Sequence, residues 1–214
     1  MIIGVLGFAG SGKGTVADIL VGKGFKKESF ADPVKDAVAA IFGWERSMLE
    51  GDTPESREFR EKQDEFWSDK LGYSVTPRYM LQLMGTEAGR DTFHPDIWIH
   101  SLMNRASKNK DTVIADVRFP NEIDAIKEAG GFLVRVKRGP EPEWYECAYH
   151  DNESHRMAAP LMKIRYPNVH VSEWAWIGNP NIEYLIPNEG TLDDLHEATE
   201  KFLQYCIACD RMLD

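Results

Sequence analysis

The stretch that decides the fold is Gly7-Phe8-Ala9-Gly10-Ser11-Gly12-Lys13-Gly14-Thr15. An apolar run at residues 2–6 precedes it and predicts a buried strand, because so short a run cannot cross a membrane. Apolar residues at helical spacing follow over residues 16–20, and Gly22 and Gly24 then give a helix stop signal. A glycine-rich loop between a strand and a helix is the context that a phosphate-binding loop requires.

The residues of this loop suit the phosphates of a nucleoside triphosphate. Glycine lets the backbone N–H groups turn inward because it has no Cβ, and the helix N-terminus adds a partial positive charge. Lys13 supplies a full charge on a mobile side chain. Gly14 stands where a Ser or Thr is usual, and Thr15 follows one position later. Rather than a turn without a ligand, we predict an ATP-binding loop made of Gly10, Ser11, Gly12, Lys13, Gly14 and Thr15.

Bulk composition limits the class of protein. A chain of 214 residues is long enough for one sizeable α/β domain with a small helical insertion. Its formal net charge of −10 argues against a nucleic-acid polymer or an anionic membrane as partner, because both need a basic surface. The sequence shows no signal peptide, and its odd number of cysteines is typical of a reducing compartment. We therefore expect a cytoplasmic protein without a membrane partner.

A second informative place is the segment from Thr112 to Arg118. Residues 113–115 predict a buried strand, and Asp116 stands at its carboxyl end. Ligands of parallel sheets bind beyond the carboxyl ends of the strands, so Asp116 should point toward the nucleotide. A carboxylate there suits a water-mediated contact with Mg²⁺. A helix from residue 120 and a strand at 132–136 complete a βαβ unit, which predicts a parallel sheet.

Lys35 is a candidate ligand of a bound phosphate. The pair Asp32-Pro33 predicts the start of a helix, and Val34, Val38 and Ile41 give it an apolar stripe. Lys35 then lies in the first turn, where the helix dipole does not favour a lysine. It is either solvated or faces a phosphate, and its position alone does not decide between the two.

The middle of the chain predicts a helical insertion that can hold an anionic molecule. Residues 45–69 are highly charged and weakly amphipathic, which predicts a mostly exposed helical excursion. Thr76-Pro77 opens the next helix, and Arg78 and Gln82 share one face of it. Residues 85–87 interrupt the helical pattern. A guanidinium here can grip an anion through two hydrogen bonds, and surface salt bridges are the alternative.

The segment from Gly139 to Asn168 has no clear period. So long a loop inside a compact domain is usually functional, for example as a lid over a site. Its histidines, His150 and His155, are either ligands or solvated side chains. A last strand is predicted at residues 182–186 and a closing helix at 191–203.

These features occur together in a known family. The chain resembles the bacteriophage-type deoxynucleoside monophosphate kinases, which belong to the P-loop kinase group, and the resemblance runs nearly end to end. It is carried by Gly7 to Thr15, Phe30-Ala31-Asp32-Pro33-Val34-Lys35, Pro77 to Thr86, Trp98, Asp116-Val117-Arg118 with Glu122, His170-Val171-Ser172-Glu173, and Asn188-Glu189-Gly190-Thr191-Leu192.

The resemblance implies a three-layer α/β P-loop kinase fold, with a parallel β-sheet flanked by helices. It implies one domain over residues 1–214, with a helical acceptor-binding insertion at about 44–110 and a lid at about 139–168. The implied reaction transfers the γ-phosphoryl group of ATP to a deoxynucleoside 5'-monophosphate, with Mg²⁺ as cofactor. Implied acceptor-binding residues are Lys35, Arg78, Gln82, Gly85, Thr86, Trp98, Asp116, His170 and Glu173, and implied donor-base residues are Asn188 and Gly190. For His170, Ser172 and Glu173, acceptor contact and anchoring of the lid both fit.

Phosphoryl transfer needs alignment and charge neutralisation more than covalent chemistry. The acceptor phosphate is itself a nucleophile at neutral pH, so no general base is required. We expect Lys13 on the β- and γ-phosphates, and Arg118 or Arg138 on the transferred group. Thr15 and Asp116 are the expected Mg²⁺ ligands, through water.

Two other functions compete with this one. A P-loop kinase acting on a coenzyme precursor would use the same loop and Asp116, but it would not need the block from Arg78 to Thr86. A nucleotide-binding regulator without turnover is disfavoured because Lys13, Thr15 and Asp116 occur together. The sequence leaves open which base is accepted and which oligomeric state forms, and a homodimer is one option.

Overall fold

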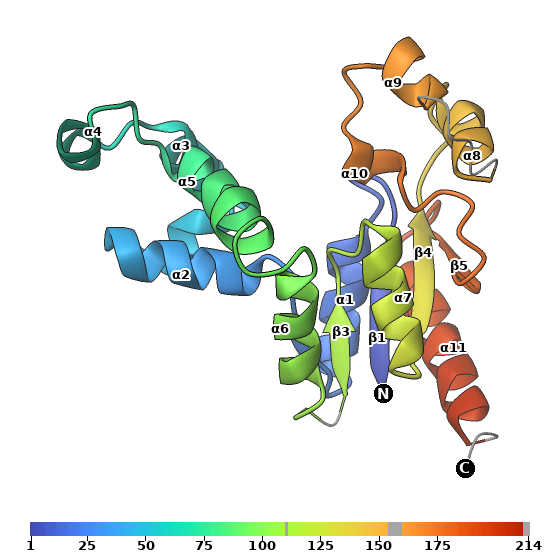
Figure 1. The fold of residues 1–214 in the computed structure, drawn as a ribbon. Coiled ribbons are helices and arrows are strands. Elements are labelled where there is room, and N and C mark those ends of the chain that lie inside the picture. Colours follow the sequence, from blue (N-terminus) through green and yellow to red (C-terminus); the bar gives the residue numbers. More distant parts are fainter. Residues whose placement is uncertain (110, 154–159, 212–214) are drawn as a thin grey trace. The chain divides into compact units, whose positions relative to one another are not determined.

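The computed structural model of this 214-residue chain describes residues 1–109, 111–153 and 160–211. The chain divides into two compact units (Figure 1). The first unit combines Met1–Glu28 with Ala106–Asp214, and the second unit is Ser29–Arg105.

The first unit is built on a five-stranded parallel sheet, which confirms the predicted α/β class. Its strand order is β2-β3-β1-β4-β5. Figure 1 shows β1 at the centre, between β3 and β4. Strands that are neighbours here are mostly distant in the chain, so helical crossovers join them. The strands are β1 (Ile2–Leu6), β2 (Lys26–Glu28), β3 (Thr112–Ile114), β4 (Phe132–Lys137) and β5 (Tyr184–Pro187).

Helices cover both faces of this sheet. On one face, Ile3 and Val5 of β1 share a buried cluster with residues of α1 (Lys13–Gly22) and α11 (Leu192–Asp210). On the other face, Gly4 of β1 lies against α7 (Pro120–Glu128), where a Cβ would come within 2.8 Å of Ile126. Alternate residues of one strand therefore serve two layers, which gives the predicted three-layer arrangement.

The predicted lid is not the aperiodic loop that its sequence indicates. It contains α8 (Tyr145–Glu153) and α9 (Leu161–Arg165), and the short helix α10 (Val171–Trp174) follows it. Ala148 and Met162 are fully buried, and the N–H of Met162 donates to the Asp151 carboxylate at 2.7 Å. These long-range contacts, rather than a repeating pattern, hold the two helices. Residues 154–159, with His155, lie outside the described residues.

Two boundaries in the C-terminal part differ from the predicted ones. Strand β5 begins at Tyr184, two residues later than expected, after a turn in which the N–H of Ile182 donates to the Asn179 carbonyl. Helix α11 continues beyond residue 203 to Asp210. It is longer because buried Cys206 extends the apolar stripe of the helix by another turn.

The second unit is helical. Thr76 caps its helix α5 by accepting a hydrogen bond from the N–H of Tyr79, as the sequence predicts. Within the described part of the chain, no helix is both long and apolar enough to cross a membrane. The elements of this unit are α2 (Asp32–Phe42), the 3₁₀-helix η1 (Arg46–Leu49), α3 (Pro54–Glu61), α4 (Glu65–Leu71), α5 (Pro77–Leu83), the π-helix η2 (Met84–Arg90) and α6 (Ile97–Ala106).

The second unit has a hydrophobic core of its own, so the expected exposed excursion is only partly right. Leu49 is fully buried and packs in one cluster with Val38 and Met80. The ring of Trp44 stacks on Phe42, with centroids 4.6 Å apart and planes 14° apart. These aromatic residues follow no helical period in the sequence and meet only when the helices pack. Conversely, Ile41, expected to face inward, is 54 % exposed.

Candidate active site

The glycine loop adopts a backbone that only glycine permits at two positions. Gly7 follows β1 with a φ of 142°, and a Cβ on it would collide with the carbonyl oxygen of Val136 in β4. Gly12 has a φ of 102° and stands at the N-cap of α1. The predicted order of strand, glycine loop and helix is therefore confirmed.

Lys13, the first residue of α1, has its charge held at the loop. Its Nζ donates a hydrogen bond to the carbonyl oxygen of Phe8 at 2.7 Å. Burial lowers the pKa of Lys13, the positive charge of Arg118 lowers it further, and the negative charge of Glu173 opposes both. The three side chains therefore form one electrostatic group, which we call the Lys13 cluster.

Arg118 and Glu173 are joined directly. The Nη1 of Arg118 donates to Oε1 of Glu173 at 2.8 Å and to Oγ of Ser172 at 3.4 Å. The backbone N–H of Arg118 donates to the buried Glu122 carboxylate at 2.7 Å, at the start of α7. The His170 ring accepts a hydrogen bond from the N–H of Ser172 at 3.2 Å and so caps α10. Residues predicted from separate motifs thus meet at one place.

The Lys13 cluster predicts a measurable change of pKa. Glu173→Gln removes the negative charge that raises the pKa of Lys13, so this pKa should fall further below its ordinary value. Arg118→Ala should raise it, because a positive neighbour is lost. NMR titration of ¹³C-methylated lysines, with the Lys13 signal assigned by its loss in Lys13→Met, measures both shifts. Glu197→Gln, an exposed change on α11, is the matched control and should leave the signal unchanged.

Asn188 supports the loop from β5. Its Nδ2 donates to the carbonyl oxygen of Ser11 at 2.9 Å, and its backbone N–H donates to the Lys137 carbonyl at 2.7 Å. A Cβ on Gly12 would lie 2.5 Å from the same Nδ2. Gly190 in turn leaves room for the Asp194 carboxylate, which accepts the N–H of Thr191 at the N-cap of α11.

Side chains with oxygen atoms occur in the glycine loop, at the start of α1 and just beyond β3. Asp116 lies two residues beyond Ile114, which pairs with Gly4 of β1, so it lies at the sheet edge where the loop begins. Thr15 lies in the first turn of α1. The Ser11 hydroxyl is buried, and among the described residues it has no hydrogen-bond partner. Carboxylate and hydroxyl oxygens are ligands that suit Mg²⁺, so these residues fit the expected ion.

Arg138 is an exposed residue directly after β4. Because β4 pairs in parallel with β1, Arg138 lies at the sheet edge from which the glycine loop departs.

In the second unit, the predicted basic residues have acidic partners. Arg78 is 53 % exposed and pairs with Glu61. The Nζ of Lys35 is 2.6 Å from Glu50, which also pairs with Arg46. Burial alone would raise the pKa of Glu50, but the hydrogen bonds from Lys35 and Arg46 lower it below its usual value. A phosphate bound by Lys35 or Arg78 would therefore have to compete with a carboxylate.

The predicted helix break at residues 85–87 is wrong, because the helix continues there as the π-helix η2. The N–H of Asp91 donates to the carbonyl of Thr86 at 3.0 Å, the five-residue spacing of a π-turn. The Nε1 of Trp98 donates to the carbonyl oxygen of Gly85 at 2.8 Å. A side chain at Gly89 would collide with the Trp98 ring. Turns of this kind are frequent at functional sites. Gln82, also a predicted acceptor residue, is exposed on the preceding helix α5.

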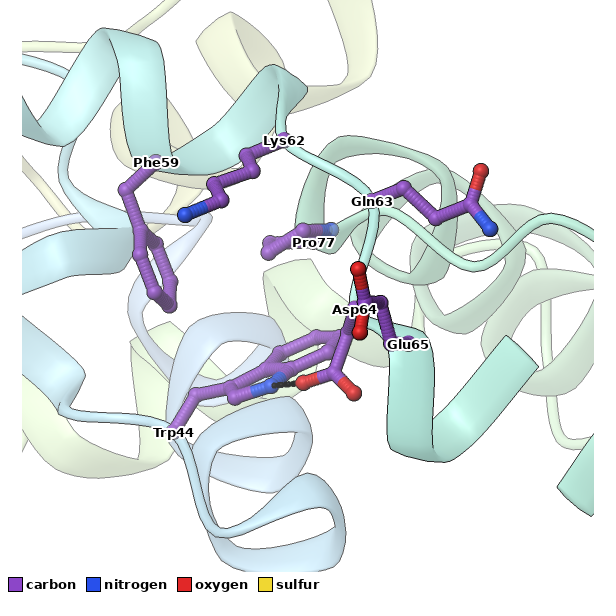
Figure 2. Close-up of a pocket in the computed structure, with 7 residues that line it drawn as sticks. All are labelled: Trp44, Phe59, Lys62, Gln63, Asp64, Glu65 and Pro77. Atoms are coloured by element: carbon purple, nitrogen blue, oxygen red, sulfur yellow. Dashed lines mark hydrogen bonds between the residues drawn. The ribbon is translucent and has the colours of Figure 1, made fainter. Parts of the chain in front are cut away.

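A cavity of about 450 Å³ lies elsewhere in the second unit. In Figure 2, Trp44, Phe59 and Pro77 form apolar walls, and a hydrogen bond of 2.8 Å joins the Trp44 Nε1 to Asp64. The cavity thus lies at the N-terminal end of α5, which begins at Pro77. Gly85 and Thr86 lie beyond the C-terminal end of this helix. None of the predicted acceptor residues is among those that line the cavity, which are Trp44, Phe59, Lys62, Gln63, Asp64, Glu65 and Pro77.

One sequence relative matches this chain over most of the length of both proteins. A protein of Acanthamoeba polyphaga mimivirus, named deoxynucleotide monophosphate kinase, is 37% identical over 153 residues, 64% of this chain and 74% of that protein. The chain belongs to this kinase family. A deoxynucleoside-5'-monophosphate kinase of Escherichia phage T5 is 46% identical over 56 residues, which are 25% of this chain and 22% of the phage protein. The family likeness predicted from the motifs is therefore confirmed.

Other comparisons add less to the assignment of this kinase. No family model matches the chain. Dephospho-CoA kinase from Campylobacter jejuni superposes over 96% of both chains, with a TM-score of 0.44 and 13% identity.

In this kinase, Arg135 is a residue near the loop that the sequence did not single out. Its guanidinium lies 5.1 Å from the ring centroids of Tyr145 and Trp176 and 5.5 Å from that of Phe8, the residue whose carbonyl binds Lys13. It also pairs with Glu141 at 2.6 Å. Arg135 therefore packs the loop against the segment predicted to be a lid. The available signal in the sequence was an arginine between two valines of a predicted strand.

Proposed function

We propose that this protein transfers the γ-phosphoryl group of ATP to a deoxynucleoside 5'-monophosphate. The observation that carries the proposal is the Lys13 cluster at the start of α1, where two cations and one carboxylate adjoin the glycine loop. Membership of the deoxynucleotide monophosphate kinase family supports the acceptor class.

On the donor side, Lys13 would exchange the Phe8 carbonyl for the β- and γ-phosphates of ATP. A hydrogen bond from the ammonium to a charged phosphate oxygen is stronger than one to a neutral carbonyl oxygen, so the exchange is favourable. The N–H groups of Gly10 to Thr15 would surround the phosphates. Asn188 would keep the loop in this shape, and Gly190 would adjoin the donor base.

Mg²⁺ is the proposed cofactor, held through water by Thr15 and Asp116. When bound, it would neutralise charge on the phosphates. In the transfer step, an oxygen of the acceptor phosphate forms a bond to the γ-phosphorus while the bond to the β,γ-bridging oxygen breaks, and ADP leaves. Arg118 and Arg138 would stabilise the charge on the transferred group. Asp116, Glu173 and His170 would lie toward the acceptor.

The acceptor nucleotide would bind to the second unit. Arg78 can release Glu61 at little cost, because exposed ion pairs contribute only about 0–1 kcal/mol. Trp98 would hold the π-turn in place through Gly85, and the exposed Thr86 would face the ligand. Lys35 and Gln82 complete the proposed set.

We also propose the wider organisation of the enzyme. One kinase domain would span residues 1–214, with residues 44–110 as the acceptor-binding insertion and residues 139–168 as a lid that excludes water during transfer. The enzyme would act in the cytoplasm, in a host cell if viral, without nucleic-acid or membrane partners, and a homodimer is compatible with this function.

The decisive assay measures ADP release with MgATP over a panel of deoxy- and ribonucleoside monophosphates that also includes a coenzyme precursor. We expect turnover with at least one deoxynucleoside monophosphate. Turnover only with a coenzyme precursor, or ATP binding without ADP release over any acceptor, would contradict the proposal.

Arg78 tests the proposed acceptor site. Arg78→Ala should raise the KM for the monophosphate at least about tenfold, or about 1.4 kcal/mol, because the two-pronged contact with phosphate is lost. The KM for ATP should change much less. Steady-state kinetics with each substrate varied in turn measures both.

Two further variants serve as references for Arg78. Arg78→Lys should recover only part of the affinity, and Lys70→Ala, an exposed cation of the same unit, should change neither KM. A raised KM for ATP with an unchanged KM for the monophosphate would move Arg78 to the donor side.

A further inference from the structure

A separate group of metal-binding side chains lies in the second unit, where α6 begins. His94, Asp96 and His100 each offer one ligand atom, and these atoms all lie within 4.8 Å of one another. The two imidazole rings have centroids 5.2 Å apart and planes 44° apart. None of the three residues belongs to the proposed kinase site.

The backbone already holds these residues in place. The N–H of Ile97 donates to the His94 carbonyl at 3.0 Å, which closes a turn before α6. The N–H of His100 donates to the Asp96 carbonyl at 2.9 Å, the helical spacing that puts both side chains on one face. Because the backbone of these residues is already fixed, binding an ion would cost little further conformational entropy of the backbone, which favours binding.

We propose that His94, Asp96 and His100 bind one transition-metal ion of the Zn²⁺ type, with a fourth position open to water. Two imidazoles and a carboxylate are a ligand set that suits Zn²⁺, Co²⁺ or Ni²⁺. Mg²⁺ prefers oxygen ligands, so this ion differs from the one proposed beside the loop. His94 and His100 are exposed, which gives an ion direct access from solvent.

Metal binding would replace a hydrogen bond that His94 now accepts. At present the Nδ1 of His94 accepts the N–H of Asp96 at 3.0 Å. Coordination through either ring nitrogen gives up this bond, because an imidazole bound through Nε2 carries its proton on Nδ1. In return, the ion would tie the turn before α6 to the first turn of that helix. The first turn of α6 also carries Trp98, which donates a hydrogen bond to the carbonyl of Gly85 in η2.

Co²⁺ is the probe of choice for this site, because its visible absorption reports the ligands and their geometry. The full chain, without a histidine tag and after treatment with a chelator, is titrated with Co²⁺ and then with Zn²⁺. We expect one Co²⁺ per chain, displaced by Zn²⁺ and not by millimolar Mg²⁺. His94→Ala and His100→Ala should each lower the affinity at least tenfold. His196→Ala, an exposed histidine on α11, is the matched control and should bind as the unmodified protein does.

The titration can overturn the proposal in three ways. Unchanged Co²⁺ affinity in both His94→Ala and His100→Ala would place the ion elsewhere. A sulfur-to-metal charge-transfer band would assign it to a cysteine. Equal loss in His196→Ala would indicate non-specific binding. His94→Gln keeps a polar side chain of similar size, so its circular dichroism and its Co²⁺ affinity together separate a lost ligand from a lost fold. None of these outcomes depends on kinase activity.

Discussion

Lys13→Met should lower the turnover number about 100- to 1,000-fold while the fold persists. Loss of one charged donor to a group that gains negative charge in the transition state costs on the order of 3–4 kcal/mol. Lys13 contacts the loop carbonyl of Phe8 and lies within the Lys13 cluster, so its charge is already at the place where the phosphates would bind. Turnover measured at saturating MgATP and acceptor tests this expectation.

The fold should tolerate this change, because burial already disfavours the charged form of Lys13 and a methionine of similar length replaces it. Thermal unfolding of Lys13→Met is the check. Lys23→Met, at the far end of α1 and paired with Glu200, is the matched control and should keep full turnover. More than about a tenth of normal turnover in Lys13→Met, a loss below about 1.4 kcal/mol, would refute the site assignment.

Arg118→Ala should lower kcat about 100-fold and change the two KM values little. The guanidinium is held by Glu173 beside Lys13, where it can move onto the transferred group. Arg118→Lys should restore only part of the rate, because an ammonium lacks the planar fork. Pre-steady-state measurement of ADP formation separates this effect on transfer from effects on product release.

A double variant distinguishes catalysis from an electrostatic side effect. Arg118→Ala leaves the Glu173 carboxylate without this partner near Lys13, and the carboxylate could by itself weaken phosphate binding. In Arg118→Ala with Glu173→Gln, the loss of kcat should persist if Arg118 acts on the transferred group. Recovery of kcat would contradict that role. Arg211→Ala, an exposed arginine at the end of α11, is the control for loss of an arginine as such.

Local chemistry made the core of the fold predictable. The glycine loop needs positive φ angles and close approach of the backbone, and only glycine allows these at Gly7 and Gly12. The buried strands and the helices around them follow from apolar spacing in short windows. Asp116 was placed by the rule that parallel strands present their carboxyl ends at one edge, and its position after β3 agrees with that rule.

The helices of the predicted lid and the core of the second unit depended on contacts across the chain. Met162 is held by Asp151, and the rings of Phe42 and Trp67 meet with centroids 5.0 Å apart, although neither pair follows a repeating pattern. The π-helix η2 likewise accepts a hydrogen bond from Trp98, which lies 13 positions after Gly85. The spacing of residues along the chain does not predict which distant residues will be in contact.

The sequence by itself determined the phosphate-binding loop and the parallel sheet around it, because glycine sterics and apolar periodicity act within a few residues. Only the tertiary structure decided which charges work together. Arg118 and Glu173 are 55 positions apart in the sequence. Arg135 packs against the ring of Phe8, far before it in the sequence, and against the ring of Trp176, far after it. An electrostatic interaction depends on distance and burial, and both exist only after the chain has folded.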